Sequence, residues 1–312
     1  MTYYLGVTNI QWYNFLRRKK PEDVNFWQPG GKLKFKVLKP GQPFLFKLKS
    51  PINAIGGLGF FSSHTFLPLN MAWAVFKESN GCDNISDFRR LILANRTDHT
   101  VTNPTIGCIV LTNPVFFEES DWVPVPDDWK PSIQQGKMYS MSSPEGKRLW
   151  NRIEAILDKY LFNNAESAKS QLLLEEPEAK YGNPILTRVR LGQNAFRVLV
   201  TDAYNRKCAI SGEKTLPVLE AAHIKQYAES GPHFISNGLL LRSDLHKLFD
   251  TGYLTITNDL KVEVSQRIKE EFENGRAYYK FHGQELTNLP ARKMDLPNRQ
   301  YLEWHHEKVY RG

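Results

Sequence analysis

The stretch VLEAAHIKQYAESGPHFISNGLLLRSDLHKLFDTGYLTI, residues 218–256, decides the fold of the C-terminal part of this 312-residue chain. Its apolar spacing predicts a strand that ends at His223, a loop, a second short strand that begins after Asn237, and a helix over residues 243–249. His223, Asn237 and His246 therefore follow one another on a strand, a loop and a helix.

Two histidines and an asparagine in this order suit the hydrolysis of a phosphodiester. At neutral pH that reaction needs a base to activate water and a divalent metal to stabilise the charge on the phosphorane and the leaving oxygen. In this interpretation His223 takes the proton from water, Asn237 holds the loop and orients the imidazole, and His246 binds the metal. Each residue alone is more often a surface or core histidine, or a simple Asn-Gly turn, so the prediction depends on the three together.

The same stretch resembles the HNH family of ββα-metal nucleases. The segments CAISG, LEAAHI and NGLLLRSDLHKLFDTG, together with the preceding RLGQNAFRVLVTDAY, resemble the McrA-like branch of that family over about residues 185–260. The resemblance implies a metal-dependent endonuclease that uses Mg²⁺, with Mn²⁺ or Ni²⁺ as substitutes.

The resemblance leaves the set of metal ligands open. HNH enzymes often carry an Asp or His ligand immediately before the base histidine, whereas this chain has Ala222 there. Asp250, four residues after His246 on the same helical face, and Glu220, from the strand, are candidates for further ligands.

The cysteines give no sign of a second metal site. Cys82, Cys108 and Cys208 lie far apart, and none of them belongs to a CxxC pair. This spacing predicts reduced thiols, no disulfide framework and no structural zinc.

Length and composition bound the rest of the interpretation. A chain of 312 residues exceeds one typical domain of about 100–200 residues, so two compact units with a connector are expected. The formal net charge of +8 and the pI near 9.2 are compatible with nucleic acid as partner, because clustered Lys and Arg displace counterions from phosphate. No apolar run is long enough for a membrane span, and residues 1–20 lack the features of an export signal, so a cytoplasmic protein is expected.

The N-terminal part has short β-rich runs separated by Gly and Pro. Residues 32–50 predict two strands around a Pro-Gly turn with one apolar and one basic face, and residues 106–117 predict another strand. Apolar spacing predicts helices over residues 68–81 and 86–96, and a further helix over residues 146–162.

Segments of this part resemble the EVE branch of the PUA-like superfamily over roughly residues 1–155. They are YYLGVTN, FWQPGGKLKFKVLKPGQPFLFKLKSP, GGLGFFSSHTFLPLNMAWAVFKESNG and IGCIVLTNPVFF. The expected fold class is therefore α+β. It consists of a PUA-like β-barrel with helices over 1–155 that reads modified bases, a helical and polar linker over 156–184, and a ββα-metal HNH nuclease domain over 185–312.

A reader of modified bases would flip the base into an aromatic pocket and follow the phosphate backbone with basic side chains. The candidate pocket walls are Trp27, Phe60, Phe61 and Trp73, for each of which a core aromatic is the alternative. The candidate backbone contacts are Lys32, Lys34, Lys36, Lys47 and Lys49, for which a solvated edge is the alternative.

Fused EVE and HNH domains are typical of modification-dependent restriction endonucleases, which the whole chain resembles. The resemblance implies double-stranded DNA with 5-methylcytosine, 5-hydroxymethylcytosine or a glucosylated form as substrate. One active site per chain cuts one strand, so a homodimer is expected. Two alternatives stay open: a non-catalytic reader of modified nucleic acid, which Ala222 favours, and an RNA-directed HNH nuclease.

Overall fold

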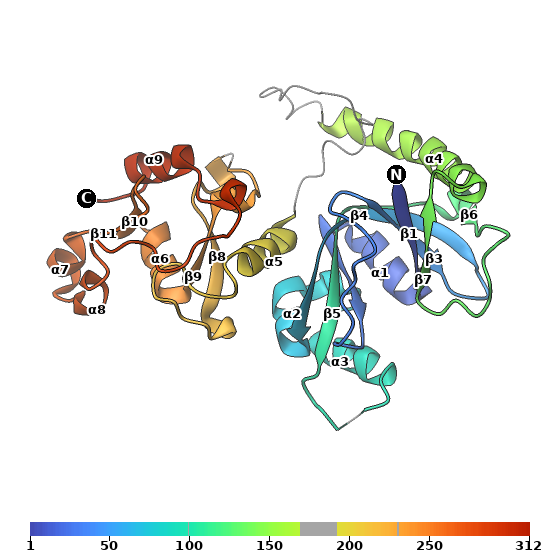
Figure 1. The fold of residues 1–312 in the computed structure, drawn as a ribbon, viewed down its shortest axis with the longest axis horizontal. Coiled ribbons are helices and arrows are strands. Elements are labelled where there is room, and N and C mark those ends of the chain that lie inside the picture. The colour runs from blue at the N-terminus through green and yellow to red at the C-terminus, as the bar shows by residue number, and fades with distance from the viewer. Residues whose placement is uncertain (99, 169–191, 230) are drawn as a thin grey trace. The chain divides into compact units, whose positions relative to one another are not determined.

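The chain divides into two compact units, Met1–Leu191 and Gly192–Gly312 (Figure 1). The structure is a computed structural model, and it describes residues 1–312 except 99, 169–191 and 230. Most of the linker expected over 156–184 and the expected start of the second unit at residue 185 lie outside the described residues. The expected α+β class is confirmed, since the first unit combines a seven-stranded sheet with helices and the second contains a ββα arrangement.

The N-terminal unit is built on one mixed sheet. Its strands are β1 (Thr2–Thr8), β2 (Asp23–Gln28), β3 (Pro43–Leu48), β4 (Ala54–Pro68), β5 (Thr105–Phe116), β6 (Val123–Pro124) and β7 (Gly136–Ser140). The order is β2-β5-β4-β3-β1-β7, with β6 paired to β4, and only the β1–β3 pair among these is parallel. Two register shifts against β5 interrupt β4, and such bulges bend a strand.

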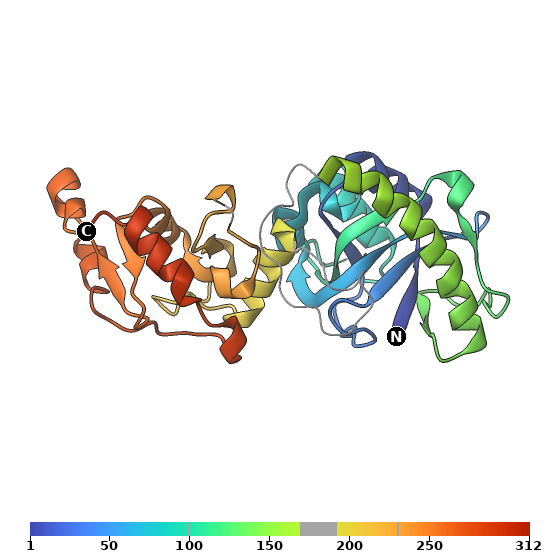
Figure 2. The same cartoon turned by 90° about the horizontal axis from the view of Figure 1, so that it is seen from above.

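Helices cover this sheet on both faces. They are α1 (Ile10–Lys19), α2 (Leu69–Phe76), α3 (Ile85–Ala94) and α4 (Pro144–Ala168). Phe44 and Phe46 of β3 pack in the same core as α1, whereas Leu45 between them packs in the core covered by α4, as expected for alternating side chains. Helix α4 is the long yellow-green helix in Figure 2. Because Leu157 of α4 still belongs to that second core, the N-terminal unit extends past residue 155, where the sequence analysis ended it.

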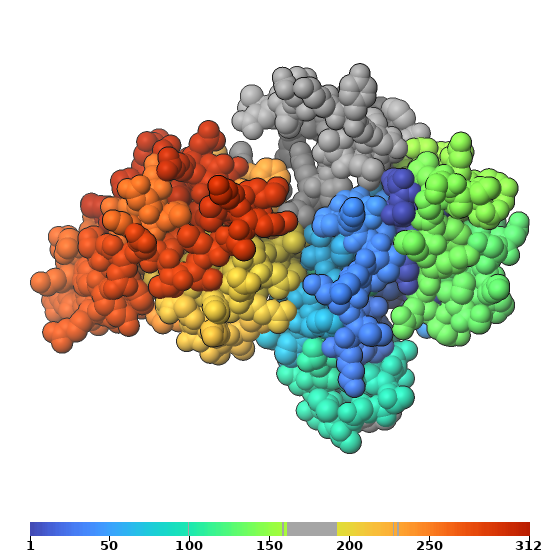
Figure 3. All heavy atoms as spheres, in the orientation of Figure 1, coloured from blue at the N-terminus to red at the C-terminus, as the bar shows by residue number. Residues whose placement is uncertain are grey.

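The expected pair of strands over residues 32–50 is half correct. The part over 43–48 forms β3, but the segment over 29–42 has no regular strand. It forms part of the surface (blue in Figure 3), while its Phe35 and Leu38 are buried in the core. Strand β3 already pairs with β1 and β4, so it has no edge left for another strand. Both faces of β3 are covered, all six of its residues are buried, and its expected basic face is therefore absent.

The other N-terminal elements expected from the sequence are confirmed. Residues 68–81 form α2 and a 3-10 turn (Lys77–Asn80), residues 86–96 correspond to α3, and residues 106–117 to β5. The cap of α3 is Asn84, whose side chain accepts a hydrogen bond from the Asp87 N–H.

The C-terminal unit confirms the predicted strand, loop, strand and helix. These elements are β8 (Leu219–His223), β9 (Gly238–Arg242) and α6 (Ser243–Asp250). They are accompanied by α5 (Gln193–Ala203), β10 (Leu254–Ile256), β11 (Val262–Val264), α7 (Arg267–Phe272), α8 (Arg276–Tyr279) and α9 (Arg299–Lys308). Strands β8 and β9 are antiparallel, and α5 and α6 pack against them around one apolar core. Among the helices of the described part of the chain, none combines the length and the apolar character that crossing a membrane requires.

Candidate active site

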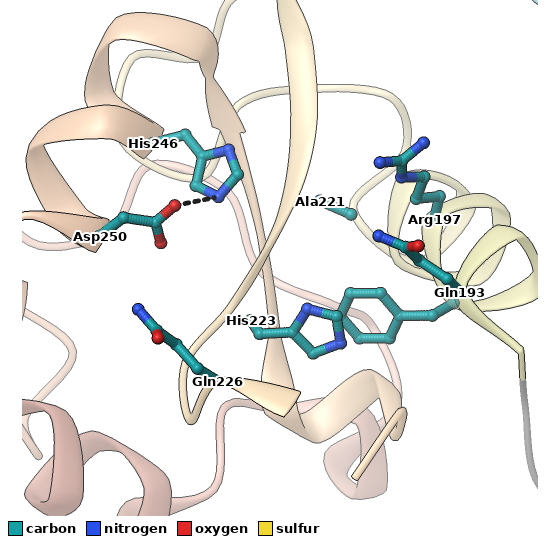
Figure 4. A pocket seen from close by; sticks show the side chains of 8 residues that line it. Gln193, Arg197, Ala221, His223, Gln226, His246 and Asp250 are labelled. Carbon is teal, nitrogen blue, oxygen red and sulfur yellow. Dashed lines mark ion pairs between the residues drawn. The ribbon is translucent and has the colours of Figure 1, made fainter. Parts of the chain in front are cut away.

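Two of the three motif residues line one cavity of about 210 Å³ in the C-terminal unit (Figure 4). His223 reaches it from the end of β8 and His246 from α6, one turn before Asp250. The remaining lining residues are Gln193, Phe196 and Arg197 of α5, Ala221 of β8, and Gln226 of the loop after β8. Arg197 adds a positive charge that suits a phosphate.

The imidazole of His223 is held by two contacts. Its Nε2 lies 2.9 Å from Nδ1 of His233, and its ring stacks on Phe196 with centroids 3.9 Å apart and planes 11° apart. Burial, together with the nearby His233, His246 and Arg197, lowers the pKa of His223 to about 4, against a smaller opposite effect of Asp250. The ring is therefore neutral at pH 7, as a general base must be.

Gly238 makes room for the stacked phenyl ring. It pairs with His223 across the hairpin, and a Cβ atom at this position would lie 2.5 Å from Val200 Cγ2 and 3.0 Å from Phe196 Cζ. The Asn-Gly sequence is thus needed for close approach of α5, and the φ angle of Gly238, −128°, is ordinary extended backbone.

Asn237 is fully buried behind the cavity and braces the loop between β8 and β9. Its Oδ1 accepts from the Lys225 N–H, and its Nδ2 donates to the carbonyl oxygens of Lys225 and Pro232, each at 2.9 Å. All three hydrogen bonds of the Asn237 side chain are thus made with the backbone of the loop. The His223 ring is instead in hydrogen-bond contact with His233.

Asn237→Ala is expected to lower the free energy of unfolding of the C-terminal unit by about 2–4 kcal/mol, because it leaves buried backbone groups unpaired. Urea unfolding of the variant would measure the loss. Asn258→Ala is the matched control, because Asn258 is exposed and its side chain donates one hydrogen bond to Glu303 within the described residues. The free energy of unfolding of this variant should change by less than about 0.5 kcal/mol. Equal stability of the two variants would contradict the bracing role.

His246 is bonded at both ring nitrogens. Nδ1 lies 2.6 Å from Glu220 Oε2, and Nε2 lies 3.2 Å from Asp250 Oδ2. Burial disfavours the protonated ring, but the hydrogen bonds to Asp250 and Glu220 outweigh it and raise the pKa of His246. The two carboxylates therefore lie on opposite sides of the imidazole and do not converge on one point.

His246 and Asp250 fit part of a metal shell. Within the described residues, no group of three or more His, Cys, Asp or Glu side chains is arranged to hold an ion. However, two ligands at right angles about 2.1 Å from an octahedral cation lie roughly 3 Å apart, close to the 3.2 Å between His246 Nε2 and Asp250 Oδ2. Magnesium sites commonly use one or two carboxylates and complete the shell with water and substrate phosphate. Glu220 contacts the other ring nitrogen of His246, the position from which a carboxylate commonly orients a metal-binding histidine.

Ala222 lies in the apolar core and is fully buried. Its neighbours in sequence, Ala221 and His223, line the cavity, so the alternation of β8 directs position 222 to the opposite face. The Ala222 methyl group is therefore part of the core and not of the cavity lining.

The four aromatic residues considered for a base pocket are not brought together. Phe60 and Phe61, each 5% exposed, belong to different cores of the N-terminal sheet. Trp27 and Trp73 both pack on Phe88, with centroids 6.2 and 6.1 Å away, and Trp27 Nε1 donates to the Asn80 carbonyl.

The five lysines considered as backbone contacts are not all exposed. Lys47 is buried, donates to Asn53 Oδ1 at 2.8 Å and lies over the Trp129 ring, and burial lowers its pKa. The exposed ones are Lys32, Lys34, Lys36 and Lys49.

A buried polar group that the sequence analysis missed lies on the N-terminal sheet. Within the part of the chain that the structure describes, Gln28 Oε1 and both ring nitrogens of His64 have no hydrogen-bond partner, and His64 is 8% exposed. A Cβ atom on Gly107 would lie 3.0 Å from Gln28 Oε1 and 3.0 Å from His64 Nε2, so both atoms flank the space left by that glycine. Burial and the charge of Lys34 lower the pKa of His64 to about 4, and the ring is neutral at pH 7.

The C-terminal site also contains residues without a sequence motif, namely His233, Arg197, Gln193 and Gln226. The i, i+4 spacing of Gln193 and Arg197 indicates that they share a helical face. No local pattern marks that face as the one towards the cavity.

Comparison with known proteins agrees with this site. Residues 208–257 match the HNH endonuclease family, so the C-terminal unit carries an HNH endonuclease domain. A search of curated protein sequences found no match.

Two solved structures are similar to larger parts of the chain. The ASCH protein from Zymomonas mobilis is 8% identical, with 48% of this chain and 94% of that chain covered and a TM-score of 0.35. The modification-dependent TagI restriction endonuclease is 14% identical, with 92% of this chain and 75% of that chain covered and a TM-score of 0.28. The EVE branch itself stays a prediction from the sequence.

Proposed function

We propose that this protein is a divalent-metal-dependent DNA endonuclease that is directed by its N-terminal unit to DNA containing a modified cytosine. The HNH match over residues 208–257 and the cavity shared by His223, His246 and Asp250 support the nuclease. The resemblance of residues 1–155 to base-reading domains supports the reader. Action in the cytoplasm as a homodimer, with one strand cut by each chain, belongs to the same proposal.

In the proposed mechanism the neutral imidazole of His223 accepts a proton from the attacking water. Arg197 lines the same cavity and would bind the scissile phosphate. His246 Nε2 and Asp250 would hold a divalent cation, with Glu220 fixing the imidazole from its other side. When bound, such a cation stabilises the negative charge on the phosphate and the leaving oxygen.

Four otherwise identical DNA duplexes test this proposal. They carry cytosine, 5-methylcytosine, 5-hydroxymethylcytosine or glucosylated cytosine, and each is incubated with Mg²⁺, Mn²⁺ or EDTA. Metal-dependent cutting confined to modified duplexes is the expected result. Equal cutting of all four would remove the modified-base reader, while binding without cutting would favour the non-catalytic alternative. A matched RNA set tests the RNA-directed alternative.

We place the base contact at Gln28 and His64. Burying polar atoms without partners costs about 1–3 kcal/mol each, so a site that presents three of them suits a ligand that supplies the missing bonds. A neutral histidine offers one donor and one acceptor, and the glutamine oxygen accepts. The exocyclic N4 amine of cytosine, a donor, and its N3 acceptor match this set. Reaching these buried atoms requires the base to leave the DNA stack.

Gln28→Leu is expected to weaken binding of modified DNA about 3- to 10-fold, the equivalent of one hydrogen bond. It should leave the thermal midpoint unchanged or higher, because it removes an unpartnered buried atom. Fluorescence anisotropy with modified and unmodified duplexes measures the first effect, and thermal unfolding the second. The exposed Gln134 provides the control Gln134→Leu. Unchanged affinity for modified DNA would exclude Gln28 from the base contact.

A further inference from the structure

We propose that His233 is a positioning residue for His223: it accepts the Nε2 proton of His223 and so leaves Nδ1 of His223 free to take the proton from water. This inference rests on the proposed nuclease function. His233 comes from the loop between β8 and β9 and has no motif around it in the sequence.

The geometry of the pair carries the inference. His223 Nε2 and His233 Nδ1 lie 2.9 Å apart, and the ring centroids are 5.0 Å apart with the planes at 59°. Two imidazoles in such contact need one nitrogen with a proton and one without. Since Nε2 of His223 is used in this bond, its Nδ1 is the nitrogen left for water.

The tautomer of His223 follows from this assignment. If Nε2 of His223 carries the proton and donates it to His233, then Nδ1 has a free lone pair and can act as a base. The opposite arrangement, with His233 donating, places the proton of neutral His223 on Nδ1 and blocks it. In the proposed step one O–H bond of water breaks, the proton moves to Nδ1, and Nε2 keeps its own proton. His233 then stabilises the imidazolium through the hydrogen bond that its Nδ1 accepts.

Asn237 fixes the position of His233 from both sides. Its side-chain Nδ2 donates to the Pro232 carbonyl, and its backbone N–H donates to the Phe234 carbonyl, both at 2.9 Å. The residues immediately before and after His233 are thus bonded to one buried asparagine. Asn237 therefore acts on the base indirectly, through His233, whereas the sequence analysis expected it to orient the imidazole itself.

Two nearly isosteric replacements test the role of His233. The Oδ1 of asparagine can take the place of the accepting Nδ1, whereas leucine has the same branching at Cγ and no acceptor there. His233→Leu is expected to lower the single-turnover cleavage rate roughly 10- to 100-fold, a part of the 10²–10⁴-fold that a general base supplies. His233→Asn should stay within about fivefold of the wild type, and both should bind DNA normally. His306→Leu, at an exposed histidine beside Glu263, is the control.

A second measurement reads the tautomer directly. In the metal-free protein with ¹⁵N-labelled histidine, NMR should show neutral His223 protonated at Nε2 in the wild type and in His233→Asn. A shift towards Nδ1 protonation is expected in His233→Leu. An Nδ1-protonated wild type, or a folded His233→Leu enzyme with the wild-type rate and tautomer, would overturn the inference. If the wild type does not cleave DNA, the proposed function fails, while the NMR result still decides the hydrogen bond.

Discussion

An enzyme with His223 replaced by alanine is expected to cleave modified DNA about 10²–10⁴-fold more slowly than the wild type, the contribution of a well-placed general base. DNA affinity should be unchanged, because the ring is stacked on Phe196 and bonded to His233 rather than exposed as a DNA contact. Single-turnover cleavage and binding anisotropy on the same duplex separate the two effects.

The pH profile gives this prediction a second readout. Burial and neighbouring charges lower the pKa of His223 to about 4, so the imidazole is unprotonated throughout the neutral range. In most molecules it is still neutral at pH 5. At saturating metal, the loss of rate that belongs to this base is expected near pH 4, rather than near pH 6.5 as for an ordinary histidine. The control His306→Ala should retain the wild-type rate and profile. Undiminished cleavage by pure His223→Ala protein would remove His223 from the base role.

The second large effect is expected at the carboxylate and imidazole on α6. His246→Ala and Asp250→Ala should each abolish metal-dependent cleavage, because each removes one of the two proposed metal ligands. The atoms concerned, His246 Nε2 and Asp250 Oδ2, lie 3.2 Å apart, as two neighbouring ligands of one cation would. EDTA should have the same effect on the wild type. Isothermal titration with Mn²⁺ measures the loss of binding independently of cleavage.

A substitution at Glu220 tests whether this residue binds the metal or orients His246. Glu220→Gln keeps an acceptor for His246 Nδ1 but loses the charge, so metal affinity should fall about 10- to 100-fold and excess metal should restore the rate. The matched control is Asp244→Asn on α6, because Asp244 is paired with Arg242 through a 2.6 Å contact. An Asp250→Ala enzyme with normal Mn²⁺ affinity would exclude Asp250 from the metal site.

In the N-terminal unit, local sequence patterns fail to predict which segments form strands and which side chains are buried. Alternating lysines over residues 32–36 predict a basic strand, but this segment forms no strand because β3 is already flanked by β1 and β4. The same flanking buries Lys47, although its side chain has the spacing of a solvent-facing residue. Phe60 and Phe61, adjacent in sequence, pack in different cores.

The sequence by itself determined the ββα unit and its two histidines. The apolar periods of β8, β9 and α6 are local, and the i, i+4 spacing of His246 and Asp250 places them on one helical face whatever surrounds them. The HNH pattern could therefore be recognised before any packing was known.

Only the tertiary structure decided what surrounds these residues. Phe196 stacks on His223, His233 contacts the same ring, and Gln28 lies beside His64, and each of these contacts joins segments that are distant in sequence. The burial of Ala222 in the core likewise depends on packing that no local period specifies. Long-range pairing sets which face of a strand is buried and which loop residue reaches a given ring. The sequence thus predicts His223 as the general base, while the orientation and protonation of its imidazole depend on the fold.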